Sequence, residues 1–391
     1  MNTQTYRAPP SISRLQQRAM IVGVIALVLT LGGALMNPAQ FFRSYLVGYL
    51  FALGFALGSL GLLMLQHLSG GHWGIVIRRP LESATRTLPL LAILFLPLTL
   101  GLRKIYIWTG PMERPLSRFQ MSYLTIPGFL TRAAIYLAIW LVLMMYMNSW
   151  SSQQDDSADP GLRRKLQLLS GPGMILYVFT MTLAAVDWVM SISPHWYSTI
   201  YGFLFVGGQV VSAMALMIAV AALLARSAPM SGILQPRHLH DLGKLLLAFV
   251  MLWAYFAFSQ LLIIWAGNLP EEIPFYLKRL RGGWGALAVL ILLFHFVLPF
   301  FLLLSRDLKR SASILPRLAI AIVLMRLLDL FWMTAPEFSP QTFRIHALDV
   351  LTPVAIGGLW LAYFAWQLQR RPLLPLGDPE LAQAIAHEEH R

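Results

Sequence analysis

Ten long apolar stretches run through this chain of 391 residues, and they constrain its fold more than any other feature. A helix needs about 20 consecutive apolar residues to cross the hydrocarbon core of a membrane. Only helices or closed barrels satisfy the backbone polar groups there, and these runs lack the alternation of barrel strands. The sequence therefore predicts an all-α integral membrane protein. We expect about ten spans, at 19–36, 44–67, 88–103, 127–147, 171–191, 199–224, 242–266, 283–304, 316–334 and 346–368.

The composition agrees with a membrane protein and excludes several other classes. Hydrophobic residues make up 57% of the chain and charged residues only 12%, about half of the roughly 25% typical of soluble domains. This excludes an ordinary soluble protein, a disordered chain and a basic nucleic-acid-binding protein. The chain has no cysteine, so it cannot hold an iron–sulfur cluster through thiolates or attach a c-type haem. We therefore expect no cofactor and no metal in this chain itself.

The Lys and Arg residues outside the spans predict the orientation. Segments expected on the side of the N-terminus carry 18 of them, and segments on the other side carry nine. Cytoplasmic loops of membrane proteins are enriched in Lys and Arg. We therefore expect both termini in the cytoplasm. The chain then divides into an N-terminal segment (1–18), a transmembrane domain (19–368) and a C-terminal tail (369–391).

Two polar segments are expected to lie outside the packed helices. Ser149–Asp159 (SWSSQQDDSAD) is typical of a flexible loop. The tail after Arg370 contains Pro372, Pro375 and Pro379. It is expected to be loosely ordered or to dock on a neighbouring protein.

Ionisable residues inside the expected spans are the candidate functional groups, because each costs on the order of 3 kcal/mol in lipid. Arg326 and Asp329 lie near mid-depth of the ninth span at an i, i+3 spacing, which places them on one face of a helix. His295 lies near the middle of the eighth span. These residues form either a structural ion pair with a packing histidine or part of a proton path.

A second group lies toward the cytoplasmic side. Asp241 and Lys244 open the seventh span in the segment HDLGK, while His67 and His72 flank the end of the second span. Helix capping and snorkelling of the lysine to the headgroups are sufficient to explain Asp241 and Lys244. The alternative is a proton entry site, because histidine titrates near neutral pH.

A third group lies toward the outer side. Asp187 is about one turn inside the end of the fifth span, and Asp349 opens the tenth span, where helix capping explains it. Tyr255, Ser259 and Gln260 add hydroxyl and amide groups to the seventh span.

Lys244, Tyr255 and Ser259 fall on a similar face at 3.6 residues per turn and could line one column. Inner and outer clusters separated by a mid-depth pair suit two proton half-channels. A packed polar helix bundle would show the same residues, since Tyr and Ser commonly join helices in membranes.

Four segments carry a resemblance to a known family. They are 48–101, which includes VIRRPLESATRTLP, 187–213, 240–280, which includes SQLLIIWAGNLPEEIP, and 324–338. They resemble the F subunit of bacterial alternative complex III, a quinol:electron-acceptor oxidoreductase. More distantly, they are similar to the NrfD and polysulfide reductase C membrane subunits.

The resemblance implies two four-helix bundles, formed by helices two to five and six to nine, with helices one and ten outside them. It also implies several partners: an iron–sulfur subunit, multihaem cytochrome c subunits and a homologous membrane subunit that binds quinol or menaquinone. Haem c and the iron–sulfur clusters would then belong to those partners. Residues that match the family's polar membrane positions are Asp187, Asp241, Lys244, Tyr255, Gln260, Arg326 and Asp329.

The leading hypothesis is therefore a cofactor-free membrane subunit that conducts protons while a neighbouring subunit oxidises quinol. A purely structural membrane anchor is the first alternative. A free-standing ion-coupled transporter is the second, although such proteins often have inverted repeats and the sequence has no evident repeat.

Overall fold

The computed structural model describes residues 6–157, 159–378 and 381, and every regular element within them is a helix. In this part of the chain, nine helical segments are long and apolar enough to cross a membrane. The prediction of an all-α integral membrane protein is confirmed. The nine segments are α1 (Pro10–Met36), α2 (Pro38–Ser69), α4 and α5 (Arg78–Thr85 and Leu88–Leu100), α8 (Ile126–Ser157), α9 (Pro160–Trp188) with η3 (Met190–Ile192), α10 (Tyr201–Leu224), α11 (Pro236–Gly267), α13 and α14 (Trp284–Ile291 and Leu298–Leu304), and α17 (Ala347–Gln369).

A tenth helix of similar length, α16 (Ile314–Thr334), corresponds to the expected ninth span. Its three charged residues, Arg317, Arg326 and Asp329, fall within every 18-residue stretch of the helix, whereas each of the other nine segments has an apolar stretch of that length with at most two charges. Short helices connect the long ones: α3 (His72–Ile75), α6 (Leu102–Ile105), η2 (Ile107–Thr109), α7 (Arg118–Tyr123), η4 (Met230–Gly232), α12 (Pro274–Leu280), α15 (Arg306–Arg310) and η6 (Ala335–Glu337).

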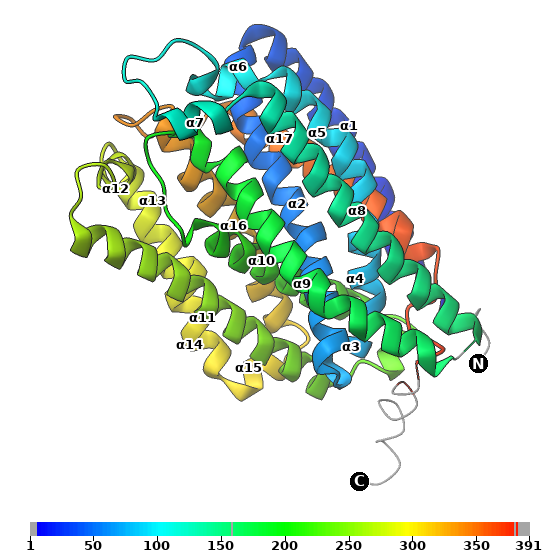
Figure 1. Ribbon diagram of the computed structural model, residues 1–391. Coiled ribbons are helices and arrows are strands. Elements are labelled where there is room, and N and C mark those ends of the chain that lie inside the picture. The colour runs from blue at the N-terminus through cyan, green and yellow to red at the C-terminus, as the bar shows by residue number, and fades with distance from the viewer. Residues whose placement is uncertain (1–5, 158, 379–380, 382–391) are drawn as a thin grey trace.

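The short helices mark the two ends of the molecule. In Figure 1, α6, α7 and α12 lie at the upper end, and α3 and α15 lie at the lower end. The start of α1 lies beside the end of α17, as shown by the hydrogen bond that the Ser13 hydroxyl donates to Oε1 of Gln369 at 2.6 Å. The long helices therefore start and finish at the lower end, as an even number of crossings requires.

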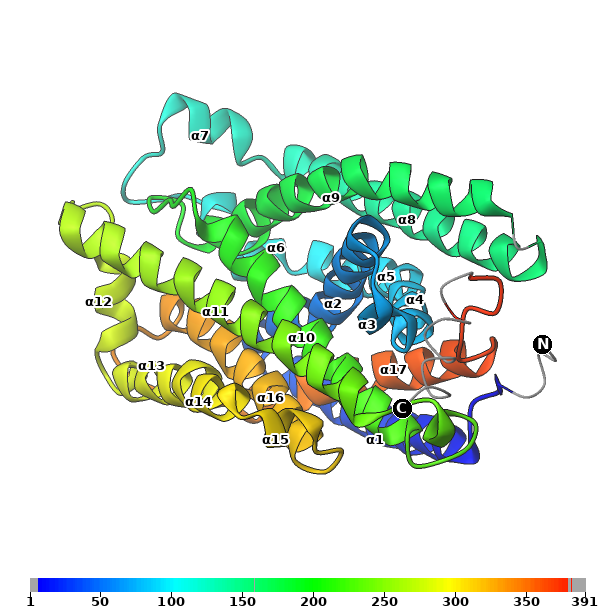
Figure 2. The same ribbon diagram turned by 90° about the horizontal axis from the view of Figure 1, so that it is seen from below.

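The long helices form two four-helix bundles. The first bundle consists of α2, α4–α5, α8 and α9, and the second of α10, α11, α13–α14 and α16. The view from below shows the first bundle on one side and the second on the other (Figure 2). Helices α1 and α17 pack along each other, and α17 also packs on α2.

The two bundles meet where α2 contacts α10. From residue 44 to residue 67, every residue of α2 is buried except Phe51 and Leu65, which are half-buried. A helix that is apolar on all sides is expected in such a central position. A Cβ atom on Gly58 would lie 2.1 Å from the backbone oxygen of Gln209 in α10. The glycine therefore allows the two backbones to approach closely, as small residues do at membrane helix interfaces.

The third span differs from its prediction. Instead of starting near residue 88, the helical segment starts at Arg78 and is interrupted by a turn between α4 and α5. Pro89, the second residue of α5, has no N–H to donate and disfavours a helical conformation at the residue before it. The Thr87 hydroxyl donates to the backbone oxygen of Ala84 at 2.6 Å and closes the turn.

The predictions for the polar segments were wrong in two places. Residues 149–157 are not a flexible loop, because α8 continues to Ser157. Asn148, Ser151 and Gln154 follow at three-residue intervals and are all buried, so this polar stretch is one face of a packed helix.

The tail is also packed rather than loosely ordered over its described part. Leu373 and Leu374 are fully buried, and the backbone N–H of Leu373 donates to the oxygen of Tyr6 at 2.8 Å. The tail thus docks on its own chain. At the other terminus, α1 begins at Pro10, well before the expected span start at residue 19, because a proline is favoured in the first turn of a helix.

Candidate functional site

Arg326 and Asp329 lie one turn apart in the second half of α16, and both are buried. Nη1 of the arginine pairs with Oδ2 of the aspartate. The guanidinium lies against α10, where a Cβ atom on Gly208 would come within 2.2 Å of Cζ of Arg326. Its Cζ atom also lies 5.7 Å from the ring centroid of Phe205. Because Gly208 has no side chain, α10 leaves room for the guanidinium of Arg326 at this position.

His295 lies in the same bundle, where the helix between α13 and α14 widens to a π-helical segment, Leu292–Val297. Its ring is fully buried and meets the indole of Trp253 edge to face, with 4.3 Å between centroids. The backbone of Ile322 lies beside the ring, but neither ring nitrogen has a partner in hydrogen-bonding geometry among the described residues. Since π-helical segments often mark functional sites, His295 is the strongest single candidate in the second bundle.

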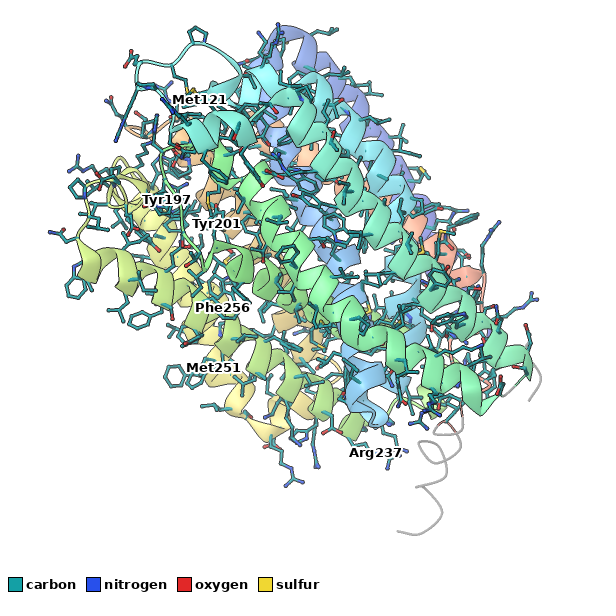
Figure 3. All side chains as sticks on the ribbon, viewed as in Figure 1. Met121, Tyr197, Tyr201, Arg237, Met251 and Phe256 are labelled. Atoms are coloured by element: carbon teal, nitrogen blue, oxygen red, sulfur yellow. The ribbon has the colours of Figure 1, made fainter. Side chains whose placement is uncertain are left out.

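A cavity of about 820 Å³ opens beside Asp329 between α11, α13–α14 and α16. Its walls are mainly apolar, and its outward rim includes Tyr255 and Met251, which are 63% and 43% exposed. Figure 3 shows Met251 on the outward side of α11. Gln260 and Tyr276 add polar groups to the wall. The buried ion pair is thus reached from the lipid-facing side through an open cavity.

Glu337 forms a second polar cluster at the upper end of the second bundle. Its carboxylate accepts from Nη1 of Arg279 and Nζ of Lys278, each at 2.8 Å, and from the hydroxyl of Ser193. Burial alone would raise the pKa of Glu337, but Arg279 and Lys278 hold that pKa below its ordinary value. Tyr201, buried at the start of α10, is close enough to both this cluster and the ion pair on α16 to interact electrostatically with each.

Asp187 is fully buried in the first bundle and is held by two partners. Nε and Nη2 of Arg132 each donate to it at 2.9 Å, and the hydroxyl of Tyr136 donates to Oδ2 at 2.8 Å. The guanidinium of Arg132 stacks on Tyr123, 3.8 Å from the ring centroid. Such a bidentate pair fixes geometry strongly, and the four residues join α7, α8 and α9 at the upper end.

The predicted polar residues on the exposed side of α11 face outward. Asp241 and Lys244 form an ion pair at 3.3 Å, and their side chains are 47% and 58% exposed. Tyr255 is also exposed and Ser259 is half-buried. These positions therefore lie on the surface of α11 rather than among packed helices, as interfacial anchoring of Asp241 and Lys244 predicts.

The remaining predicted residues have separate surroundings. Gln260 is buried and accepts from the hydroxyl of Ser198 at 3.3 Å. Asp349 caps α17 by accepting from the N–H of His346 at 2.9 Å, and it also accepts from Ser44 of α2 at 2.6 Å. The structure therefore brings Asp329, Arg326, His295 and Gln260 to one bundle and leaves Asp349 as a helix cap.

The last two predicted residues, His67 and His72, lie at the end of α2 and just after it. His67 is buried at the lower end of α2, and its Nε2 atom has no partner among the described residues. The side chain of His72 lies outside the part that the structure describes.

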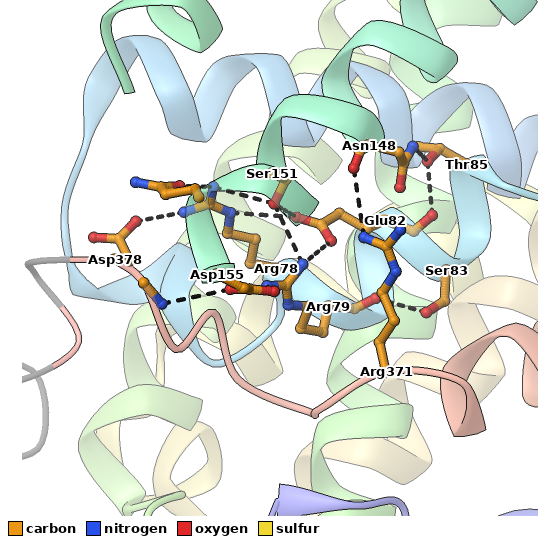
Figure 4. A network of polar contacts seen from close by, with 12 residues as sticks. Arg78, Arg79, Glu82, Ser83, Thr85, Asn148, Ser151, Asp155, Arg371 and Asp378 are labelled. Carbon is orange, nitrogen blue, oxygen red and sulfur yellow. Dashed lines mark hydrogen bonds and ion pairs between the residues drawn. The ribbon is translucent and has the colours of Figure 1, made fainter. Parts of the chain in front are cut away.

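A large buried ionic cluster lies at the lower end of the first bundle, and sequence reasoning treated its residues as loop charges. Arg78 and Arg79 of α4 are 1% and 2% exposed, and Glu82 between them is 1% exposed. Glu82 accepts from Nε of Arg78 at 3.3 Å and from Nη1 of Arg79 at 2.5 Å. Figure 4 shows this network.

Residues far away in the sequence complete the cluster. Arg78 pairs with Asp378 of the tail, and Arg79 pairs with Asp155 of α8. The hydroxyl of Ser151 donates to Glu82 at 2.5 Å. The signal that could have revealed the cluster is the polar face of 148–157, whose spacing matches a helix. The cluster fastens the tail to the first bundle.

Within the described residues, no three His, Asp or Glu side chains gather as a metal-ligand set. Compared with protein-family models and with curated proteins, the chain matches none of them.

Proposed function

We propose that this chain is a membrane subunit of a quinol:electron-acceptor oxidoreductase of the alternative complex III kind. In this proposal it provides part of a proton path, and a neighbouring subunit oxidises the quinol. The observation that carries it is the buried Arg326–Asp329 pair beside His295, whose ring nitrogens have no hydrogen-bond partner within the described part of the chain. Buried ionisable residues inside a membrane commonly mark proton pathways.

The surroundings of the pair support a route toward the upper surface. Tyr201 interacts electrostatically with both the ion pair and Glu337, and Lys278 beside Glu337 is 38% exposed. Water molecules between such groups can pass protons along hydrogen bonds. Toward the lower end, His295 is the first titratable group beside the pair, and this half of the path requires further waters.

The orientation and the partners belong to the same proposal. The surplus of Lys and Arg at the lower end favours a cytoplasmic location for that end in a bacterial inner membrane. The sequence resemblance favours an iron–sulfur subunit, multihaem cytochrome c subunits and a homologous quinol-binding membrane subunit as partners.

A purely structural role is the second candidate, and the ionic cluster around Glu82 favours it. Removing one partner of a buried ion pair leaves an unpaired charge and is strongly destabilising, whereas replacing both partners by apolar residues is often neutral. The double substitution Arg326→Met/Asp329→Leu therefore separates the two functions.

The test uses the complex purified from cells and reconstituted in vesicles. We expect the double variant to assemble and to oxidise quinol, but with a lower number of protons released per electron. The matched control is Asp349→Asn, which changes a carboxylate at a helix cap. If the double variant assembles and retains the full proton yield, the proton-path function is wrong and the structural one stands.

Co-purification tests the quinol assignment separately. We expect detergent extraction to recover haem-containing and iron–sulfur subunits with the chain. Recovery of the chain alone, colourless and active in vesicles, would contradict membership of such a complex.

A further inference from the structure

Three arginines gather at the lower end of the molecule, where the end of α17 approaches the turn between α4 and α5. Arg86, Arg370 and Arg371, together with Gln367, line a cavity of about 520 Å³. We propose that this cavity binds the phosphodiester headgroup of an anionic phospholipid. Arginine forks suit phosphate oxygens, and basic pockets between helices on the cytoplasmic side can bind anionic lipid headgroups.

The arginines that line the cavity have no direct ion pair with a carboxylate among the described residues, although Glu82, Asp155 and Asp156 lie near enough to interact electrostatically with two of them. Among the described residues, no carboxylate oxygen lies within 4.0 Å of Arg86, Arg370 or Arg371. The nearby carboxylates of Glu82, Asp155 and Asp378 are engaged by the other two arginines of the ionic cluster. Asp156, a further carboxylate close to Arg371, is exposed.

One nitrogen at the cavity is buried and unsatisfied. Nε of Arg86 donates to Oδ1 of Asn148 at 2.7 Å, but Nη2 of Arg86 is buried and has no partner among the described residues. A buried charged donor without an acceptor is costly. Arg86 therefore carries an uncompensated donor close to the cavity, and its charge adds to those of Arg370 and Arg371 in attracting a phosphate.

The surface beside the cavity fits the rest of a phospholipid and not a free anion. Helix α5 starts directly after the turn that carries Arg86, and its exposed residues Pro89, Ile93 and Leu96 repeat at helical spacing. Ile93 and Leu96 are 62% and 59% exposed. Acyl chains can run along this apolar stripe while the headgroup occupies the cavity.

The aromatic residues next to the cavity mark the same depth. Tyr363 and Trp366 stack with 5.3 Å between centroids, and both share one face of α17 with Gln367 and Arg370. Cζ of Arg370 lies 3.7 Å from the ring centroid of Trp366. Tyr and Trp are enriched where membrane and water meet, so the headgroup level of the bilayer coincides with the cavity.

The experiment measures lipid binding to the delipidated full chain in detergent by native mass spectrometry. The probes are dioleoyl phosphatidylglycerol, dioleoyl phosphatidylcholine and inorganic phosphate. The wild-type chain should retain one phosphatidylglycerol and bind the other two much more weakly. In Arg370→Gln/Arg371→Gln, the phosphatidylglycerol affinity should fall about 25-fold, because each basic side chain near a membrane surface contributes about fivefold.

The matched control is Arg14→Gln/Arg18→Gln, which removes two exposed arginines of α1 at the same end of the molecule as the cavity. Its affinity for phosphatidylglycerol should stay within about twofold of the wild-type value. A third variant, Gln367→Glu, keeps every arginine but adds a carboxylate to the cavity. It should also weaken phosphatidylglycerol binding. If the arginine variant does not fold, Gln367→Glu still tests whether the cavity binds the lipid.

Three results would overturn the proposal. The first is equal loss of phosphatidylglycerol in the cavity variant and the control, and the second is equal affinity for phosphatidylcholine in the wild-type chain. The third is displacement of phosphatidylglycerol by millimolar inorganic phosphate, which would identify a site for a free anion.

Discussion

The two four-helix bundles hold their buried charges in different ways. In the first bundle, Glu82 and Asp187 lie toward opposite ends, and each accepts from arginines and hydroxyls in closed networks. In the second bundle, the Arg326–Asp329 pair lies beside an open cavity and a histidine, His295, whose ring nitrogens find no hydrogen-bond partner among the residues that the structure describes. Carboxylates held by several charged and hydroxyl donors keep one geometry, whereas incompletely satisfied groups can exchange protons with water. The carboxylates of the first bundle are therefore held rigidly, and the second bundle contains the groups on which the proposed proton path rests.

The largest effect is expected at Glu82, where Glu82→Gln would leave Arg78 and Arg79 without their shared counter-charge. Removing one partner from a buried ion pair costs roughly 3–5 kcal/mol, so we expect little folded protein and a released tail. The measurement is thermal unfolding in detergent together with protease sensitivity of the tail.

The control for this prediction is Glu113→Gln, which changes an exposed glutamate at the upper end and should unfold like the wild type. If Glu82→Gln also unfolds like the wild type, the closed network is not what makes the first bundle rigid.

The second effect concerns the space that holds Arg326. A methyl group at position 208 would meet the guanidinium at 2.2 Å, and overpacking of this kind costs about 1–3 kcal/mol. We expect Gly208→Ala to lower the unfolding temperature and to reduce the proton yield of the complex, because the cation is displaced from Asp329.

Gly357→Ala serves as the matched control, because nothing lies within 4 Å of a Cβ atom at that position in α17. It should be neutral or slightly stabilising. A Gly208→Ala variant with unchanged stability and unchanged proton yield would show that the position of Arg326 is unimportant.

The third effect is a pH dependence that arises at Glu337. The pKa of this carboxyl is lowered in the folded chain by Arg279 and Lys278, against the effect of burial. Its contribution to stability is therefore complete above the unfolded-state pKa, about 4.3, and is lost as the pH falls below that value through the folded pKa. Glu337→Gln should make the loss of stability below about pH 4 shallower, as measured by acid unfolding in detergent.

The matched control is Glu272→Gln, on the segment before α12, which forms no ion pair with the other described residues and should leave the acid limb unchanged. An unchanged acid limb in Glu337→Gln itself would mean that the upper cluster of the second bundle adds no pH-dependent stability.

The smallest effect is expected at the exposed pair on α11. Asp241 and Lys244 are about half exposed, and such pairs contribute roughly 0–1 kcal/mol. Asp241→Asn should therefore change the unfolding temperature little. A large fall in proton yield in this variant, without a change in stability, would instead identify the lower end of α11 as a proton entry site and extend the path beyond His295.

The sequence by itself determined the class of fold and the position of most spans. The length of an apolar run decides whether it can cross a membrane, and backbone groups in lipid must bond within their own helix. The i, i+3 spacing likewise placed Arg326 and Asp329 on one face of a helix before any tertiary contact was known. Both are local properties of the chain, so pattern alone predicts them.

Tertiary structure decided which charges are compensated. Asp187 meets an arginine 55 positions away, and Arg78 meets an aspartate 300 positions away. For the same reason, the pattern of residues 149–157 predicts a loop, whereas in the structure polar side chains of this segment form hydrogen bonds with the buried arginines of α4. The cost of a buried charge depends on what surrounds it in space, and a partner hundreds of residues distant leaves no local pattern in the sequence.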